Sequence, residues 1–163
     1  MNHADIRTLY DYSAWATDRI FAQAEKLTDA QFASAPPGSL PSIRRILAHT
    51  LGAEVLWRAR FQTGQSTINV REEHFPDVAA LRQAWEAHRQ ATSAYIATLD
   101  DATVQAPLRF ERRGTQVEMT LWHVFCQLSN HGTQHRAEVA ALLTDYGHSP
   151  GDLDFLFYAL ASR

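Results

Sequence analysis

The sequence predicts an all-α protein: a four-helix bundle with a short β-hairpin between the third and fourth helices and a short C-terminal helix. Four segments, each of roughly 20 residues, carry apolar residues at three- and four-residue steps. Polar or Pro/Gly-rich connections separate them, and only one segment alternates apolar with polar residues. The helices are expected at residues 5–26, 42–62, 77–99 and 121–145, the hairpin at 107–120 and the final helix at 152–160. We expect residues 1–163 to form a single domain, because this length buries a core of its own.

Local signals place the ends of the first two helices. The connection LTDAQFASAPPGSLP ends the first helix, because Pro-Pro-Gly at residues 36–38 cannot continue it. Ser39 or Ser42 is expected to cap the second helix, with Pro41 in its first turn.

Further signals place the later elements. Asp77 is expected to cap the third helix, and Thr120 the fourth. Gly147 should end the fourth helix, and Gly114 should supply the positive φ of the hairpin turn.

Composition excludes several classes of protein. The net charge of −3 and the scattered arginines give no reason to expect a nucleic-acid partner. No apolar run approaches the roughly 20 residues that span a bilayer, so no membrane association is expected. The polar start lacks a signal-peptide core, and the single cysteine, Cys126, excludes an internal disulfide. We therefore expect a cytoplasmic location.

The segment SNHGTQHRAEV, residues 129–139, contains a candidate metal-binding pair of histidines. His131 and His135 are four residues apart, so they project from one face of a helix, one turn apart. They are also in phase with Val124, Leu128 and Leu142, which predicts that they point into the bundle. Two imidazoles at this spacing can bind one transition-metal ion. The alternatives are two solvated histidines or a hydrogen-bonded polar cluster.

A third ligand is expected from another helix. His49 is in phase with Ile46 and Ala53, so it too is expected to face inward. Three imidazoles leave one or two coordination positions open, which is typical of a catalytic metal centre. Without a thiolate, this set suits Zn²⁺ or Ni²⁺.

The remaining histidines and neighbouring polar residues are weaker candidates. We expect no ligand among His3, His74, His88, His123 and His148. Glu54 is poorly placed as a fourth ligand, and Glu138 either orients a ligand or lies on a solvated face. Asn130 is a candidate for the wall of a pocket, Arg136 is expected to pair with a carboxylate across helices, and Cys126 is expected to be a small buried hydrophobe. Trp15, Trp57, Trp85 and Trp122 are expected in the core, the alternative being the wall of a substrate pocket.

Together these residues resemble a known family. His49 in ILAHTLGAEVLW, the run NHGTQHRAEVAALLTDYGHSP and the opening LYDYSAWATDRIFAQAEKLT are similar to the DinB-like (DinB/YfiT-like) family of candidate metalloenzymes. The resemblance covers essentially the whole chain and implies a four-helix bundle with His49, His131 and His135 as metal ligands. Gln127 stands where many members carry a further histidine. The resemblance also implies use of a low-molecular-weight thiol such as bacillithiol or mycothiol.

The expected function is that of a metal-dependent enzyme acting on a small electrophile through a metal-bound thiol or water, as a thiol S-transferase or a hydrolase. The alternative is a stress-response protein that binds a metal or small molecule without turnover. A small-molecule substrate is expected, and the apolar final helix DLDFLFYAL favours a homodimer.

Overall fold

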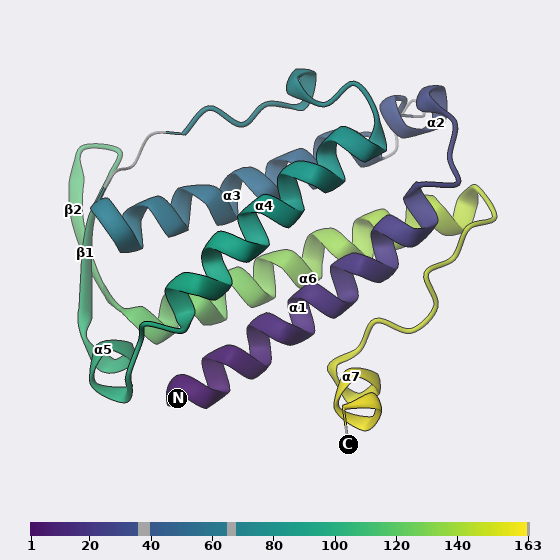
Figure 1. Cartoon of the computed structure of the whole chain (residues 1–163). Helices are drawn as coiled ribbons and strands as arrows, with labels where there is room; N and C mark the ends of the chain where they lie inside the picture. The colour runs from purple at the N-terminus through teal and green to yellow at the C-terminus, as the bar shows by residue number, and fades with distance from the viewer. Residues whose placement is uncertain (36–39, 65–67, 163) are drawn as a thin grey trace.

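Four long helices form a bundle, which confirms the predicted fold class (Figure 1). The computed structural model describes residues 1–35, 40–64 and 68–162. Both α1 and α3 pack against α6, and α4 packs against α1 and α3. The long helices are α1 (His3–Ala24), α3 (Ile43–Thr63), α4 (Val78–Ile96) and α6 (Leu121–Asp145).

Side-chain caps determine where α1 and α3 begin. Asn2 accepts a hydrogen bond from the backbone N–H of Asp5, whose carboxylate accepts one from the backbone of Asn2. This capping box starts α1 two residues before the predicted position. Ser42 caps α3, so Pro41 precedes the cap and is not in the first turn as predicted. The alternative cap, Ser39, and the Pro-Pro-Gly segment lie outside the described residues.

Two short helices were not predicted. α2 (Asp29–Ala33) starts with a capping box between Thr28 and Gln31. The third long helix starts at the predicted cap, Asp77, but ends at Ile96, and α5 (Asp101–Gln105) follows. A five-residue helix is too short to show a hydrophobic period, so only its capping residue marks it in a sequence.

The predicted hairpin is present at one end of the bundle (Figure 1). Strands β1 (Pro107–Arg112) and β2 (Thr115–Thr120) pair antiparallel around a two-residue turn, in which Arg113 and Gly114 have φ of 52° and 77°. The prediction for Gly114 is therefore confirmed. Phe110 is buried against Trp57, with ring centroids 4.9 Å apart, and this contact anchors the hairpin on α3.

The fourth long helix begins and ends where expected. Thr120 occupies the N-cap position of α6, although its side chain makes no capping hydrogen bond. Gly147 has φ of 80° just beyond the last turn, as predicted for a helix-ending glycine. The short helix α7 (Phe155–Ala161) packs along α1, where Phe155 and Tyr158 meet the ring of Tyr12. No helix in the described part of the chain is both long and apolar enough to cross a membrane.

Candidate metal centre

The bundle brings the three predicted histidines together. His49 comes from the middle of α3, and His131 and His135 come from α6, against which α3 packs. One nitrogen of each ring lies within 4.8 Å of the corresponding nitrogens of the other two. The Nε2 atoms of His131 and His135 are 3.2 Å apart. Two nitrogens bound to one tetrahedral Zn²⁺ would be about 3.3 Å apart, so this pair already has the spacing of an ion site.

The cluster faces solvent more than expected. His49 is exposed, and the other two histidines are half-buried. The prediction that all three side chains point into the bundle is thus wrong for His49. A residue can share the phase of an apolar stripe and still lie at the stripe's edge, because a core-facing stripe is at least about 100° wide. The cluster is therefore accessible from outside.

Glu138 orients one of the candidate ligands. Its Oε2 lies 2.6 Å from Nδ1 of His135, one turn earlier on α6. With the proton on Nδ1 donated to this carboxylate, Nε2 is left as the acceptor that a metal needs. Carboxylate–histidine pairs of this kind fix the tautomer of metal-binding imidazoles. Of the two alternatives for Glu138, the contact favours the orienting role.

The ring nitrogens of His131 are poorly satisfied by the described part of the protein. Nδ1 of His131 is buried and has no hydrogen-bond partner among the described residues. Its Nε2 lies 3.2 Å from Nε2 of His135, a pair in which a single proton can be shared. A divalent ion would instead bind both lone pairs, so the donor set fits a borderline metal. No other group of three or more His, Cys, Asp or Glu in the described ranges is arranged to hold a metal, and no fourth such residue joins this one.

Partial burial and repulsion from neighbouring histidines favour the neutral forms of His49 and His131. Burial lowers the pKa of His49 and of His131 below 6.5, and the neighbouring histidines lower it further. The carboxylate of Glu138 opposes these effects at both rings, and that of Glu54 opposes them at His131. Neutral imidazoles are the form that binds a metal.

This shift has a measurable consequence for the metal-free protein. Since the pKa of both groups is lower in the folded state than the unfolded value of 6.5, the unfolded chain binds more protons as the pH falls below 6.5. The melting temperature of the metal-free protein should therefore fall as the pH is lowered from neutrality. The variant His49→Gln/His131→Gln should lose less stability over the same range, and an identical pH dependence would contradict this attribution.

A buried arginine explains the glycine between the two candidate ligands His131 and His135. Arg136 is almost fully buried, donates to the hydroxyl of Thr133 and lies over the ring of Tyr12. Among the described residues it has no carboxylate partner, so the predicted ion pair across helices is wrong. A Cβ on Gly132 would lie 2.8 Å from Nη1 of Arg136. Gly132 thus makes room for the guanidinium against the helix.

This contact can be tested with a double-mutant cycle. Alanine in place of glycine inside a helix ordinarily stabilises it by about 1 kcal/mol. In the wild-type background we expect Gly132→Ala to destabilise instead, because the immobilised guanidinium must move. In an Arg136→Met background the same change should stabilise the protein. Chemical denaturation of the four proteins measures this sign change, and equal effects in both backgrounds would exclude the contact as the cause.

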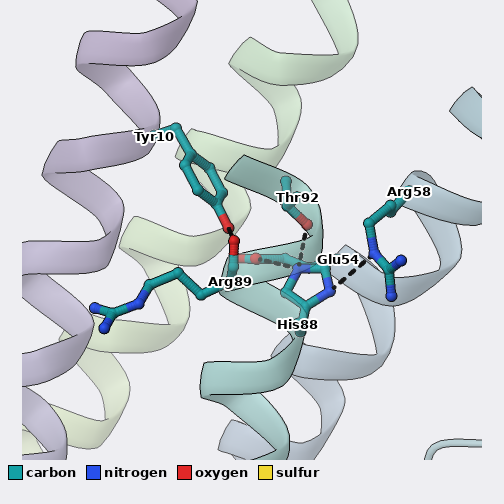
Figure 2. Close-up of polar contacts among 6 residues, drawn as sticks. All are labelled: Tyr10, Glu54, Arg58, His88, Arg89 and Thr92. Carbon is teal, nitrogen blue, oxygen red and sulfur yellow. Dashed lines mark hydrogen bonds and ion pairs between the residues drawn. The ribbon is translucent and has the colours of Figure 1, made fainter. Parts of the chain in front are cut away.

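Sequence reasoning missed a second polar cluster in the bundle interior (Figure 2). His88, expected to be unimportant, is buried on α4, and its Nε2 lies 3.0 Å from Oε2 of Glu54 on α3. Arg58 donates to Nδ1 of His88 at 3.4 Å, which assigns the proton to Nε2. The hydroxyl of Thr92 is 3.2 Å from the same Nε2. Glu54 and Arg58 are four residues apart on α3, but this spacing indicates a pair within one helix and not the contact with His88.

The other candidates from the sequence stay apart from the three-histidine cluster. His123, Asn130 and Gln127 are exposed. His3 contacts the carbonyl of Ile96, and Cys126 is half-buried with its sulfur 3.3 Å from that of Met1. Of the four tryptophans expected in the core, only Trp85 is buried, and Trp15, Trp57 and Trp122 are half-buried. His74 lies in the 3₁₀ helix Glu72–His74, and His148 follows the end of α6.

Comparisons with known proteins agree with this architecture. Protein DinB of Bacillus subtilis (strain 168) is 22% identical over 161 residues, which cover 95% of this chain and 94% of that protein. Among solved structures, YfiT from Bacillus subtilis is described as a probable metal-dependent hydrolase with an unusual four-helix bundle topology. It matches with a TM-score of 0.63 at 21% identity, over 88% of this chain and 86% of that one. The family model of the DinB family matches residues 1–162, and the chain therefore belongs to the DinB family.

Proposed function

We propose that this protein binds one divalent ion, Zn²⁺ or Ni²⁺, through His49, His131 and His135 and is a metal-dependent enzyme acting on small electrophiles. The observation that carries the proposal is the convergence of three imidazole nitrogens within 4.8 Å of one another, with no fourth His, Cys, Asp or Glu ligand in the described ranges. Structural zinc sites are typically closed by four protein ligands, whereas catalytic sites keep a position open. The similarity to YfiT supports hydrolysis as the reaction class.

The residues around the cluster have separate tasks in this proposal. Glu138 holds the ring of His135 with Nε2 free. The exposure of His49 leaves the ligand nitrogens open to a substrate from solvent. A divalent ion held there would lower the pKa of a coordinated water or thiol and so supply a nucleophile near neutral pH.

Water and a low-molecular-weight thiol are the two candidate nucleophiles. With water, the enzyme is a hydrolase, and its turnover does not depend on an added thiol. With a thiol such as bacillithiol or mycothiol, it is an S-transferase, and no product forms until the thiol is added. The similarity to YfiT, a probable metal-dependent hydrolase, favours water as the first hypothesis.

The test uses protein purified without a histidine tag. Elemental analysis should find close to one divalent ion per chain. Activated esters and other electrophilic probes should then be turned over by the metal-loaded protein, with and without added thiol. Chelation should abolish turnover and the metal should restore it. Turnover that survives complete removal of the metal would rule out the proposed mechanism.

We also propose that α7 mediates a homodimer. Its apolar side chains Phe155, Leu156, Phe157 and Leu160 are exposed on the monomer, and the two leucines are more than half exposed. A second copy of the same surface would cover them around a twofold axis. Sedimentation equilibrium should show a dimer for the wild type and a monomer for Leu156→Glu/Leu160→Glu. The control Ile68→Glu, at an exposed site away from α7, should remain dimeric, and a monomeric wild type would refute the proposal.

A further inference from the structure

A cavity opens into the bundle beside the second polar cluster. Side chains of α1, α3, α4 and α6 line it. The space that the centre of a water-sized molecule can occupy is about 20 Å³, within about 440 Å³ of empty space that includes open solvent at the mouth. None of the three metal-site histidines lines it. Its walls are largely apolar, with Ile6, Leu9, Phe61 and Phe125 among the lining residues. Apolar walls with a few polar groups are typical of small-molecule sites.

The polar groups in this cavity are rich in unused hydrogen-bond donors. Ser13 on α1 and Ser129 on α6 both line it, and neither hydroxyl has a partner among the described residues. Arg58 on α3 also lines it, and within the described part of the chain only its Nε is engaged, by His88. The terminal guanidinium nitrogens, Nη1 and Nη2, are left to donate. Donors from three helices therefore converge on one space.

The charged groups that line the cavity leave the guanidinium of Arg58 available to a ligand. Glu54 and Arg58 both line it, but they do not form an ion pair with each other, because Glu54 is held by His88. Arg136 adds a buried positive charge within electrostatic reach of Glu54. The nearby guanidinium of Arg89 is balanced by Asp18 and Glu86. Arg58 is thus a lining guanidinium that no carboxylate pairs with among the described residues.

We propose that this cavity binds a small organic monocarboxylate, with its carboxylate on Arg58 and its apolar body between α1, α3 and α6. A guanidinium with free Nη atoms suits a carboxylate because two parallel N–H donors match its two oxygens. The hydroxyls of Ser13 and Ser129 add further donors, and the ring of Phe61 and its apolar neighbours accommodate a short chain. The narrow space favours an unbranched ligand.

Two residues that line the cavity are close in sequence to the candidate metal ligands. Ser129 precedes His131 by two residues, and Glu54 follows His49 by five. Assigning the bound carboxylate to the substrate of that centre rests on the proposed function. Carboxylate binding itself requires no metal, so the two proposals can fail independently.

The test compares three matched probes on the full-length, metal-free protein: butyrate, butan-1-ol and butylamine. Chemical-shift titration should give saturable binding that is tightest for butyrate. Arg58→Met should weaken butyrate binding about tenfold or more, because a charge-assisted hydrogen bond is lost, and should leave butan-1-ol unaffected. Arg58→Lys should restore part of the affinity for butyrate.

Two further variants locate the site. Ser13→Leu should fill the cavity and abolish binding of both butyrate and butan-1-ol. Arg7→Met, at an exposed arginine of α1, is the matched control and should change nothing. The proposal is overturned if butyrate does not bind, if butylamine binds as tightly, or if Arg7→Met weakens butyrate as much as Arg58→Met. If the protein shows metal-dependent turnover but does not bind butyrate, only this inference is wrong. If it binds butyrate but shows no turnover, only the proposed function is wrong.

Discussion

Replacing His49 with alanine is expected to reduce the metal content from close to one ion per chain to nearly none, and to abolish metal-dependent turnover. In the proposed site His49 is the single ligand from α3, so without it an ion would have only two imidazoles, both on one helix. Two histidines four residues apart bind a metal ion weakly, so water and buffer molecules can displace the ion. Elemental analysis and a titration with a competing chelator measure the loss.

Two matched variants make this result specific. His123→Ala removes an exposed histidine from α6 and should leave the metal content unchanged. Glu138→Gln keeps the shape of the side chain but weakens its hold on His135, and should lower metal affinity by roughly 10- to 100-fold. If His49→Ala retained a full complement of metal, the three-histidine site would be wrong.

The hydrophobic periodicity, the helix-capping residues and the glycine and proline breaks were sufficient to predict the bundle. Asp77, Gly114 and Gly147 act locally, through a cap or a positive φ, and local chemistry can be inferred from a sequence. The short helices α2 and α5 escaped prediction because a single turn has no period. The cap of α3 was left open between Ser39 and Ser42, and Pro41 was misplaced, because all three residues are plausible at a helix start. Only the structure shows that Ser42 accepts the capping bond.

The candidate site was only partly predictable. The spacing of His131 and His135 and the phase of His49 were enough to name three residues that the structure brings together. Helical periodicity shows on which face of α3 the His49 side chain lies, but not how far the neighbouring helices cover that face. The exposure of His49 could therefore not be inferred. The pairing of His88 with Glu54 joins residues 34 positions apart on different helices, and no local pattern announces such a contact.

The largest effect on stability outside the apolar core is expected from His88→Leu. The His88 side chain is 2% exposed and that of Glu54 is 13% exposed, so the pair is shielded from water. Leucine would leave the Oε2 of Glu54 without its donor and the Nε of Arg58 without its acceptor. The cost of an unpartnered buried carboxylate suggests a loss of about 2 to 3 kcal/mol in unfolding free energy. This value lies below that for a fully buried ion pair, because Glu54 retains some exposure.

The double variant distinguishes a pairing effect from a packing effect. In His88→Leu/Glu54→Leu both polar partners are replaced by apolar side chains, so no carboxylate is stranded. Its stability should be higher than that of either single variant and close to that of the wild type. Chemical denaturation measures all four proteins, with the exposed His123→Leu as a control that should change little. Destabilisation equal to the sum of the two single changes would show that the pair has no coupling.

If the double variant is about as stable as the wild type, the polar cluster must have a use other than stability. Apolar side chains at these two positions would then hold the bundle together as well as the histidine and the carboxylate do. The polar pair would not be needed for stability, and its use would have to be sought in the cavity that Glu54 and His88 line together. The double variant keeps Arg58 but frees it from His88, so it should still bind butyrate, with an altered affinity. Stability and ligand binding would then respond to different members of the same cluster, as expected for a site whose residues are not required for folding.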